Sequence, residues 1–215
     1  MKKNFDLIIF DWDGTLVDSI GWIVQCIQYA AESCACSIPQ TQAAKDIIGL
    51  SLNEALQHLF PAADAAMQEA LTKAYRGLFF SKTIGRDDLF AGVYEMLCHL
   101  QHAGYSLAVA TGKTRSGLNW ALQGTGTTEL FNITRCADET ASKPDPAMIR
   151  EILENLKIAK HRALMVGDSI HDLEMAENAE IQSVAVSCGA HAPDLLQEYR
   201  PLHCLQQTKE LLEIL

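Results

Sequence analysis

Long apolar runs and closely spaced cysteines are what this 215-residue chain lacks. No stretch approaches the roughly 18 apolar residues that a membrane-spanning helix needs, so no span is predicted. The seven cysteines are scattered, and Cys34 and Cys36 form the one close pair. A structural zinc site needs two close pairs or a mixed set with histidine. The cysteines are therefore expected to be reduced, buried thiols of a cytoplasmic protein.

Positive charge is also scarce, with 17 lysine and arginine residues against 27 aspartate and glutamate residues. The net charge of −10 argues against a nucleic-acid or anionic membrane surface as partner, since phosphate backbones select basic stripes. We therefore expect neither nucleic acid nor a membrane among the partners. An acidic protein that handles phosphate groups would do so at a local site that includes a metal ion.

What the chain does contain, after about residue 90, is an alternation of short apolar segments with amphipathic ones. This alternation predicts an α/β fold with a doubly wound parallel sheet. The last 20 residues predict a short edge strand near 202–205 and a final helix. The segments expected to be the main strands are 5–10, 105–111, 132–136, 162–168 and 181–187.

The segment between the first two expected strands carries only helical signals, over residues 16–83. Its first helix is expected over 16–36, and a later helix is expected to have Pro61 at its first position. A segment without a strand cannot continue the alternation of strands and helices. We therefore predict that residues 1–15 and 84–215 form the α/β core and that the segment 16–83 is a small all-helical domain.

Polar side chains follow the expected strands at their carboxyl ends. Ligands of an open parallel sheet bind at that edge, near the switch in strand order, so these side chains should converge there. Asp11 and Asp13 are two residues apart, so in an extended chain they would point the same way and repel each other. The residues expected at this edge are Asp11, Asp13, Thr111, Gly112, Lys113, Lys143, Asp168, Ser169 and Asp172.

The residue types at this edge favour phosphoryl chemistry. Asp11, Asp13 and Asp168 supply the hard oxygen donors that Mg²⁺ prefers. A divalent cation and the amine of Lys143 would offset the repulsion and, with Thr111, form an electropositive seat for a phosphoryl group. An aspartate at such a seat can attack phosphorus and form an aspartyl-phosphate. The second aspartate can then exchange protons with the leaving group and with water.

Four segments, DWDGTLVDS, ATGK, SKP and GDSIHD, resemble the motifs of the haloacid dehalogenase-like hydrolase superfamily in order and spacing. The resemblance covers nearly the whole chain and implies a Rossmann-like core with a helical cap inserted after the first motif. GLSL at 49–52 is similar to a turn in caps of the phosphoglycolate phosphatase-like branch. The resemblance therefore implies a phosphatase of small phosphorylated metabolites, with a substrate similar to phosphoglycolate.

The resemblance also implies roles for individual residues. Asp11 would be the nucleophile and Asp13 the general acid and base, with its main-chain carbonyl on Mg²⁺. Thr111 and the N–H of Gly112 would hold the phosphoryl group, although relatives often have asparagine where this chain has Gly112. The remaining implied roles are neutralisation of the nucleophile and phosphate by Lys143, direct Mg²⁺ binding by Asp168, and support from Asp172 and Ser169 behind them.

Three other functions remain open at this stage. A dehalogenase of the same fold needs neither a metal nor an acid at Asp13, so Asp13 disfavours it. A phosphosugar mutase would use the same site and return the phosphoryl group to the sugar. A phospho-accepting receiver module would have no helical cap and would carry its acceptor aspartate on a later strand. The oligomeric state cannot be read from the sequence. The basic residues that could meet a substrate carboxylate are Lys45, Lys73, Arg76 and Lys82.

Overall fold

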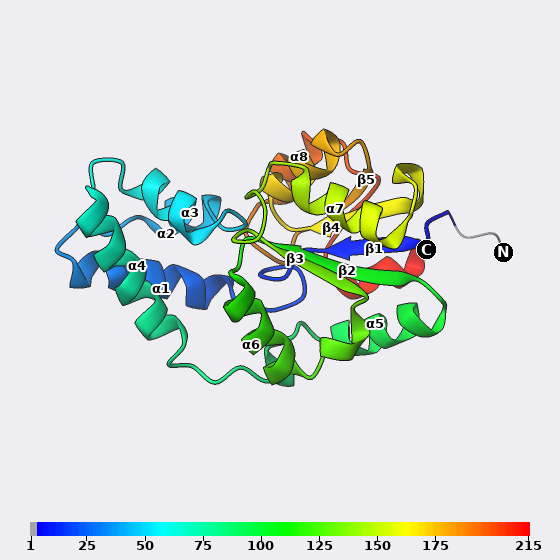
Figure 1. The fold of residues 1–215 in the computed structure, drawn as a ribbon, viewed down its shortest axis with the longest axis horizontal. Helices are drawn as coiled ribbons and strands as arrows, with labels where there is room; N and C mark the ends of the chain where they lie inside the picture. Colours follow the sequence, from blue (N-terminus) through cyan, green and yellow to red (C-terminus); the bar gives the residue numbers. More distant parts are fainter. Residues whose placement is uncertain (1–3) are drawn as a thin grey trace.

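The computed structural model describes residues 4–215, and a six-stranded sheet forms its centre (Figure 1). The strand order is β3-β2-β1-β4-β5-β6, and every neighbouring pair is parallel. The predicted doubly wound parallel sheet is confirmed, and the order switches between β1 and β4. The strands are β1 (Leu7–Phe10), β2 (Ser106–Thr111), β3 (Ile133–Cys136), β4 (Ala163–Gly167), β5 (Gln182–Val186) and β6 (Cys204–Leu205).

The central strand β1 is short and wholly apolar, and all four of its residues are buried. An uninterrupted apolar run is typical of a strand that is covered on both faces. Phe10, its last residue, pairs with Val109 of β2 and with Val166 of β4. The carboxyl ends of the three strands at the switch therefore lie at one level, and the residues that follow them are brought together.

Helices cover both faces of the sheet, and the alternate side chains of β1 separate the two cores. Ile8 and Phe10 pack in one cluster with α5 (Val93–His102) and α6 (Arg115–Thr125). Leu7 and Ile9 pack in the other, with α7 (Ala147–Leu156) and α8 (Ile170–Asn178). The shorter elements are η1 (Arg86–Asp88), η2 (Thr128–Leu130), η3 (Lys160–Arg162), α9 (Pro193–Gln197) and η4 (Thr208–Glu213).

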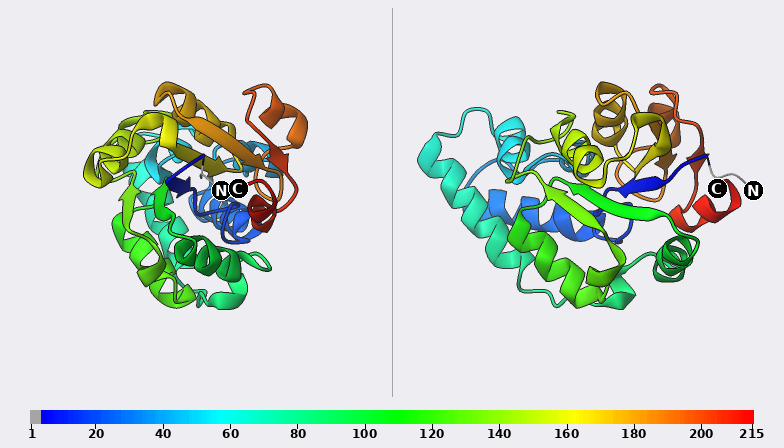
Figure 2. Two further views of the ribbon diagram at one scale, coloured as in Figure 1. Left: turned by 90° about the vertical axis from the view of Figure 1, so that its right-hand side faces the viewer. Right: turned by 45° about the vertical axis from the view of Figure 1, so that its right-hand side comes forward.

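Four helices, which we call the helical insertion, lie between β1 and η1. They project beyond the carboxyl edge of the sheet, at the left of Figure 1, and α1 and α4 run side by side in all three views (Figures 1 and 2). Within the described residues 4–215, none of the named strands falls in this insertion. The helices are α1 (Ile20–Ser33), α2 (Thr41–Asp46), α3 (Leu52–Leu59) and α4 (Ala65–Phe79).

Some predicted element ends were wrong. The first helix begins at Ile20 instead of residue 16, because the N–H groups of Leu16 and Val17 close a tight turn onto the carbonyl of Trp12. Pro61 lies outside α4, whose N-cap is Asp64. The final helix is a 3-10 helix, η4. None of the described helices is both long and apolar enough to cross a membrane.

Candidate active site

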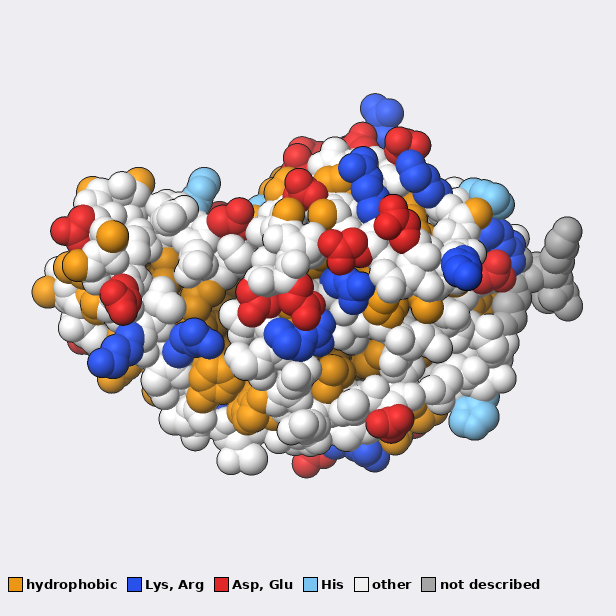
Figure 3. All heavy atoms as spheres, viewed as in Figure 1, with side chains coloured by type: hydrophobic (Ala, Val, Ile, Leu, Met, Phe, Trp, Pro, Cys, Tyr) orange, Lys and Arg blue, Asp and Glu red, His pale blue; other side chains and the backbone are white. Residues whose placement is uncertain are grey.

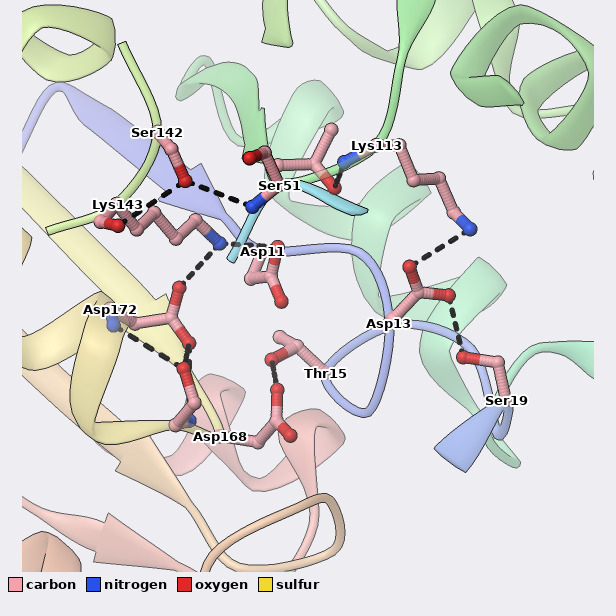
Figure 4. A network of polar contacts seen from close by, with 12 residues as sticks. Asp11, Asp13, Thr15, Ser19, Ser51, Lys113, Ser142, Lys143, Asp168 and Asp172 are labelled. Atoms are coloured by element: carbon pink, nitrogen blue, oxygen red, sulfur yellow. Dashed lines mark hydrogen bonds and ion pairs between the residues drawn. The ribbon is translucent and has the colours of Figure 1, made fainter. Parts of the chain in front are cut away.

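The polar residues predicted at the strand ends lie together at the carboxyl edge of the sheet (Figure 4). The N–H of Asp11 donates to the carbonyl of Val166 at 3.0 Å, so the main chain continues the pairing of β1 with β4 for one more residue. This bond fixes Asp11 at the strand end, where only 2% of the residue is exposed. Thr111 ends β2 and Asp168 follows β4, and both are buried.

Lys143 joins two of the carboxylates. Its ammonium lies 2.6 Å from Oδ1 of Asp11 and 2.6 Å from Oδ1 of Asp172, and all three side chains are almost fully buried. Burial lowers the pKa of Lys143, but the attraction of Asp11 and Asp172 outweighs it and raises the pKa above its ordinary value. Lys143 is therefore a permanent cation in a site where water cannot screen its charge.

Asp172 is held by the start of α8. Ser169 is the N-cap, and its N–H and hydroxyl both donate to Oδ2 of Asp172, at 3.1 and 2.6 Å. Both carboxylate oxygens of Asp172 are thus occupied, one by Ser169 and the other by Lys143. The sequence motif that contains Ser169 and Asp172 is therefore a reciprocal capping box that also positions Lys143.

Asp168 is held by residues that sequence reasoning did not assign to the site. The hydroxyl of Thr15 donates to its Oδ1 at 2.7 Å, and the N–H of Ala190 donates to its Oδ2 at 2.7 Å. A Cβ at Gly189 would lie 2.0 Å from Oδ2, so only glycine allows this approach. Gly189 and Ala190 follow β5, so the strand-end argument could have identified them had it been extended to that strand.

Three buried carboxylates, those of Asp11, Asp168 and Asp172, have oxygen atoms within 4.8 Å of one another. Burial raises the pKa of Asp11 well above its ordinary value, against the effect of Lys143. Burial, with repulsion from Asp172, raises the pKa of Asp168 to about 7. The single ammonium of Lys143 is thus near three buried acids, so negative charge is in excess when the acids are ionised. Carboxylate oxygens in such a group are the hard donors that Mg²⁺ prefers.

Asp13 points away from this acidic group, toward the helical insertion (Figure 4). Its carboxylate accepts a 2.6 Å hydrogen bond from Ser19 and lies 2.9 Å from the ammonium of Lys113. Asp11 and Asp13 were expected to face the same way; both line one cavity, but β1 ends at Phe10 and the two carboxylates have different partners. Each aspartate has its own lysine, and the carboxylate of Asp13 is not among the clustered metal-ligand candidates.

A cavity of about 100 Å³ lies between this edge of the sheet and the helical insertion. Asp11, Asp13, Thr111, Gly112 and Lys113 line it on the core side. Among the acidic residues that the structure describes, only Asp11 and Asp13 reach the cavity. Asp11 alone therefore belongs both to this cavity and to the group of three carboxylates.

The segment between α2 and α3 rests on the core beside the site. The N–H of Ser51 donates to the hydroxyl of Ser142 at 2.9 Å, next to Lys143. The ring nitrogen Nε2 of His171 lies 2.9 Å from the carbonyl of Asp46. His171 therefore contacts the insertion. These bonds hold the insertion over the carboxyl edge of the sheet.

A family model described as haloacid dehalogenase-like hydrolase matches residues 8–186. The chain belongs to this family. A probable phosphatase, IndB, of Dickeya dadantii is 32% identical over 200 residues, which cover 91% of this chain and 86% of the relative. A pyrophosphatase, PpaX, of Bacillus velezensis is 29% identical over 216 residues, which cover 99% of this chain and 97% of the relative.

The structural comparison agrees. The solved structure of a predicted phosphoglycolate phosphatase from Haemophilus somnus matches with a TM-score of 0.85 at 21% identity, covering 100% of this chain and 99% of that one. At 21% identity this similarity shows that the two proteins share a fold and nothing more. The predicted family is confirmed, and the enzyme is a phosphatase of the haloacid dehalogenase-like type.

Proposed function

We propose that this enzyme hydrolyses a small phosphomonoester with Mg²⁺ and through an aspartyl-phosphate on Asp11. The observation that carries the proposal is the double position of Asp11, which lines the cavity and also belongs to the buried acidic group. A nucleophile needs this combination, because it has to reach the substrate while its charge is held by fixed partners. Lys143 holds Oδ1 of Asp11, which leaves the second oxygen for attack.

In the first step a carboxylate oxygen of Asp11 attacks phosphorus, and the bond from phosphorus to the leaving oxygen breaks. Asp13 gives a proton to that oxygen, so the alcohol leaves neutral. In the second step Asp13 takes a proton from a water molecule, which attacks the aspartyl-phosphate, and inorganic phosphate is released with Asp11 restored. Thr111 and the N–H of Gly112 would hold the phosphoryl oxygens, while Lys143 offsets their charge.

Asp11 and Asp168 would hold Mg²⁺, together with the main-chain carbonyl of Asp13. Asp172 is less suited to direct binding, because its two oxygens already accept hydrogen bonds from Lys143 and Ser169. Its role would be to fix Lys143. Bound Mg²⁺ would neutralise charge on the phosphoryl oxygens, which is the main source of catalysis in phosphoryl transfer.

We further propose that residues 16–83 act as a cap on a core formed by 1–15 and 84–215. The cavity lies between the helical insertion and the core, so a bound substrate would be shielded from bulk water on the insertion side. With water excluded, the charges that stabilise transfer of the phosphoryl group to Asp11 are less screened and therefore act more strongly. The cytoplasm as the place of action stays a prediction.

A substrate such as phosphoglycolate, which the family resemblance implies, requires a cation for its carboxylate. Of the four basic residues considered from the sequence, Arg76 is the one that lines the cavity. Lys82 is instead paired with Asp88 at 2.6 Å. Pyrophosphate, the substrate class in the name of PpaX, would likewise depend on Arg76 beyond the core residues.

The proposal is tested by assaying the purified protein against a panel of phosphorylated metabolites, with Mg²⁺ and with a chelator. We expect continuous release of inorganic phosphate that stops when the chelator removes the metal. A mutase would convert a sugar phosphate into its isomer without net phosphate release. A receiver module would keep about one equivalent of phosphoryl group for minutes. Either result would overturn the proposal.

A further inference from the structure

The wall that the helical insertion contributes to the cavity is almost entirely apolar. α1, the segment after α2, and α3 all contribute branched aliphatic side chains to it. Of the described side chains of α1–α4 that line the cavity, only those of Tyr75 and Arg76 carry a polar group. The apolar residues that form the greater part of this wall include Ile23, Ile27, Ile47, Ile48, Leu52 and Leu56.

This apolar wall is a fixed surface. Ile23, Ile27 and Ile48 are at least 94% buried and belong to the apolar core that joins the insertion to α6. Leu56 is fully buried in the second core of the insertion. Because these side chains are tightly packed, they cannot rotate aside and let polar groups behind them reach a ligand. The chemical character of the wall is therefore set before a substrate arrives.

The polar groups near the wall offer few hydrogen bonds. The Lys113 ammonium is paired with Asp13 and lies 4.6 Å from the ring centre of Phe79. The ring of Tyr75 stacks on Phe79 at a centroid distance of 5.5 Å, and burial raises its pKa, so its hydroxyl stays protonated. Arg76 is exposed. A polyhydroxylated or anionic group against this wall would lose its water, and among the described residues of α1–α4 only the side chains of Tyr75 and Arg76 could offer it hydrogen bonds.

Size restricts the leaving group as well. At about 100 Å³ the cavity is small beside the roughly 300–1,000 Å³ of typical ligand pockets. The core side of that cavity has to receive the phosphoryl group near Asp11 and Thr111. In Figure 3, apolar side chains reach the surface where the insertion at the left meets the core. The space that remains on the insertion side suits a compact group with apolar surface.

We propose that the natural substrate is a phosphomonoester of a compact apolar alcohol, branched aliphatic or aromatic, with no more than one polar substituent. The inference rests on the proposed phosphatase function and specifies its substrate class. Asp11 and Thr111 bind the phosphoryl end, and the wall of isoleucine and leucine side chains binds the alcohol. The single polar substituent, where the alcohol has one, meets Tyr75 or Arg76. Phosphoglycolate, pyrophosphate and phosphosugars are then poor substrates.

The test compares kcat/KM for 3-methylbutyl phosphate and glycerol 3-phosphate. Both are primary alkyl phosphates with five heavy atoms beyond the ester oxygen; glycerol 3-phosphate has two hydroxyl groups and branches at C2, whereas 3-methylbutyl phosphate has none and branches at C3. Since each unpaired hydroxyl costs roughly tenfold, we expect 3-methylbutyl phosphate to be preferred by about a hundredfold. Equal or reversed values would overturn the inference.

A matched pair of variants locates the preference in the wall. Leu52 and Leu59 are both partly buried on α3, but only Leu52 is among the residues that line the cavity. We expect Leu52→Gln to lower the preference about tenfold and Leu59→Gln to leave it unchanged. A ratio of two substrates cancels any loss of folded enzyme. Equal effects of the two variants would contradict the assignment of the wall.

p-Nitrophenyl phosphate separates failure of this inference from failure of the proposed function. Turnover of this generic ester without the expected preference would overturn the substrate class and leave the phosphatase function standing. Absence of turnover for all three esters, with Mg²⁺ present and the protein folded, would overturn the proposed function and the substrate class with it.

Discussion

A Cβ on Gly112 would lie 2.3 Å from the main-chain oxygen of Leu50. Gly112 follows β2 at the catalytic edge, and Leu50 belongs to the segment of the insertion that rests on the core. Glycine at this position therefore permits a contact between the main chains of the core and of the insertion. Any larger side chain here would meet the main chain of Gly49 and Leu50.

Gly112→Ala should weaken the closed arrangement, because the obstacle is main chain and cannot rotate away. We expect kcat/KM for p-nitrophenyl phosphate to fall at least about tenfold, since a 1 Å misplacement can cost a hundredfold. Gly77→Ala in α4 is the matched control, because a Cβ there meets nothing within 4 Å. That control should keep full activity and gain about 0.5–1 kcal/mol of stability. Wild-type activity of Gly112→Ala would contradict the role given to this contact.

Lys143→Met should reduce the free energy of unfolding by about 3–5 kcal/mol, because it leaves the carboxylates of Asp11 and Asp172 buried without their cation. Urea unfolding of the metal-free protein measures the change. Lys160→Met removes the exposed pair with Glu180 and should change the free energy by less than about 1 kcal/mol. A similar small loss for both variants would show that the buried carboxylates do not depend on Lys143.

Mg²⁺ should raise the melting temperature of the wild type, because a ligand that binds only the folded state stabilises it by mass action. Asp168→Asn should remove this rise, since Asp168 is the buried acid with no lysine directly on its carboxylate. Asp145→Asn, at an exposed acid before α7, is the control and should keep it. A thermal shift that persists in Asp168→Asn would place the metal elsewhere.

The pair of Glu139 and Arg115 should make stability depend on pH in a defined window. Two hydrogen bonds from Arg115, at 2.8 and 2.6 Å, lower the pKa of Glu139 below its ordinary value of 4.5. A carboxyl whose pKa is lowered on folding stabilises the protein above its unfolded pKa, and the contribution is lost as pH falls through the folded value. Glu139→Gln should therefore melt below the wild type at pH 7.

The difference should be modest, at most about 1 kcal/mol, because both side chains are about a third exposed. It should shrink once pH falls below 4.5 and vanish when Glu139 is protonated in both states. Melting temperatures from pH 3 to 8 measure it, and Glu69→Gln on the surface of α4 corrects for the change in net charge. A difference that grows toward low pH would be the wrong sign.

The strand ends show how far the sequence could predict the site. Asp11, Thr111 and Asp168 follow strands whose apolar runs and register are local properties, so their shared edge could be inferred. The partners of Asp13 could not, because Lys113 comes from another segment of the chain. The support of Asp168 by Thr15 likewise crosses 153 positions and leaves no pattern in the sequence.

The helical insertion was predictable as a segment but not in detail. The helical spacing of its apolar residues predicts the helices, but their ends depend on which of several nearby residues acts as the N-cap. Pro61 suits a first helical position, but the Asp64 side chain accepts from the N–H of Met67 at 2.9 Å and starts the helix there. The apolar wall of the cavity combines residues from separate helices, so it emerges only from the packing.

The most direct measurement is the steady-state turnover of p-nitrophenyl phosphate by Asp11→Asn, with Mg²⁺ and beside the wild type. Asparagine keeps the shape of the side chain but lacks the anionic oxygen that attacks phosphorus. The proposed mechanism predicts a loss of at least about a thousandfold in kcat, with a folded protein by circular dichroism. Full activity of Asp11→Asn would contradict the aspartyl-phosphate mechanism.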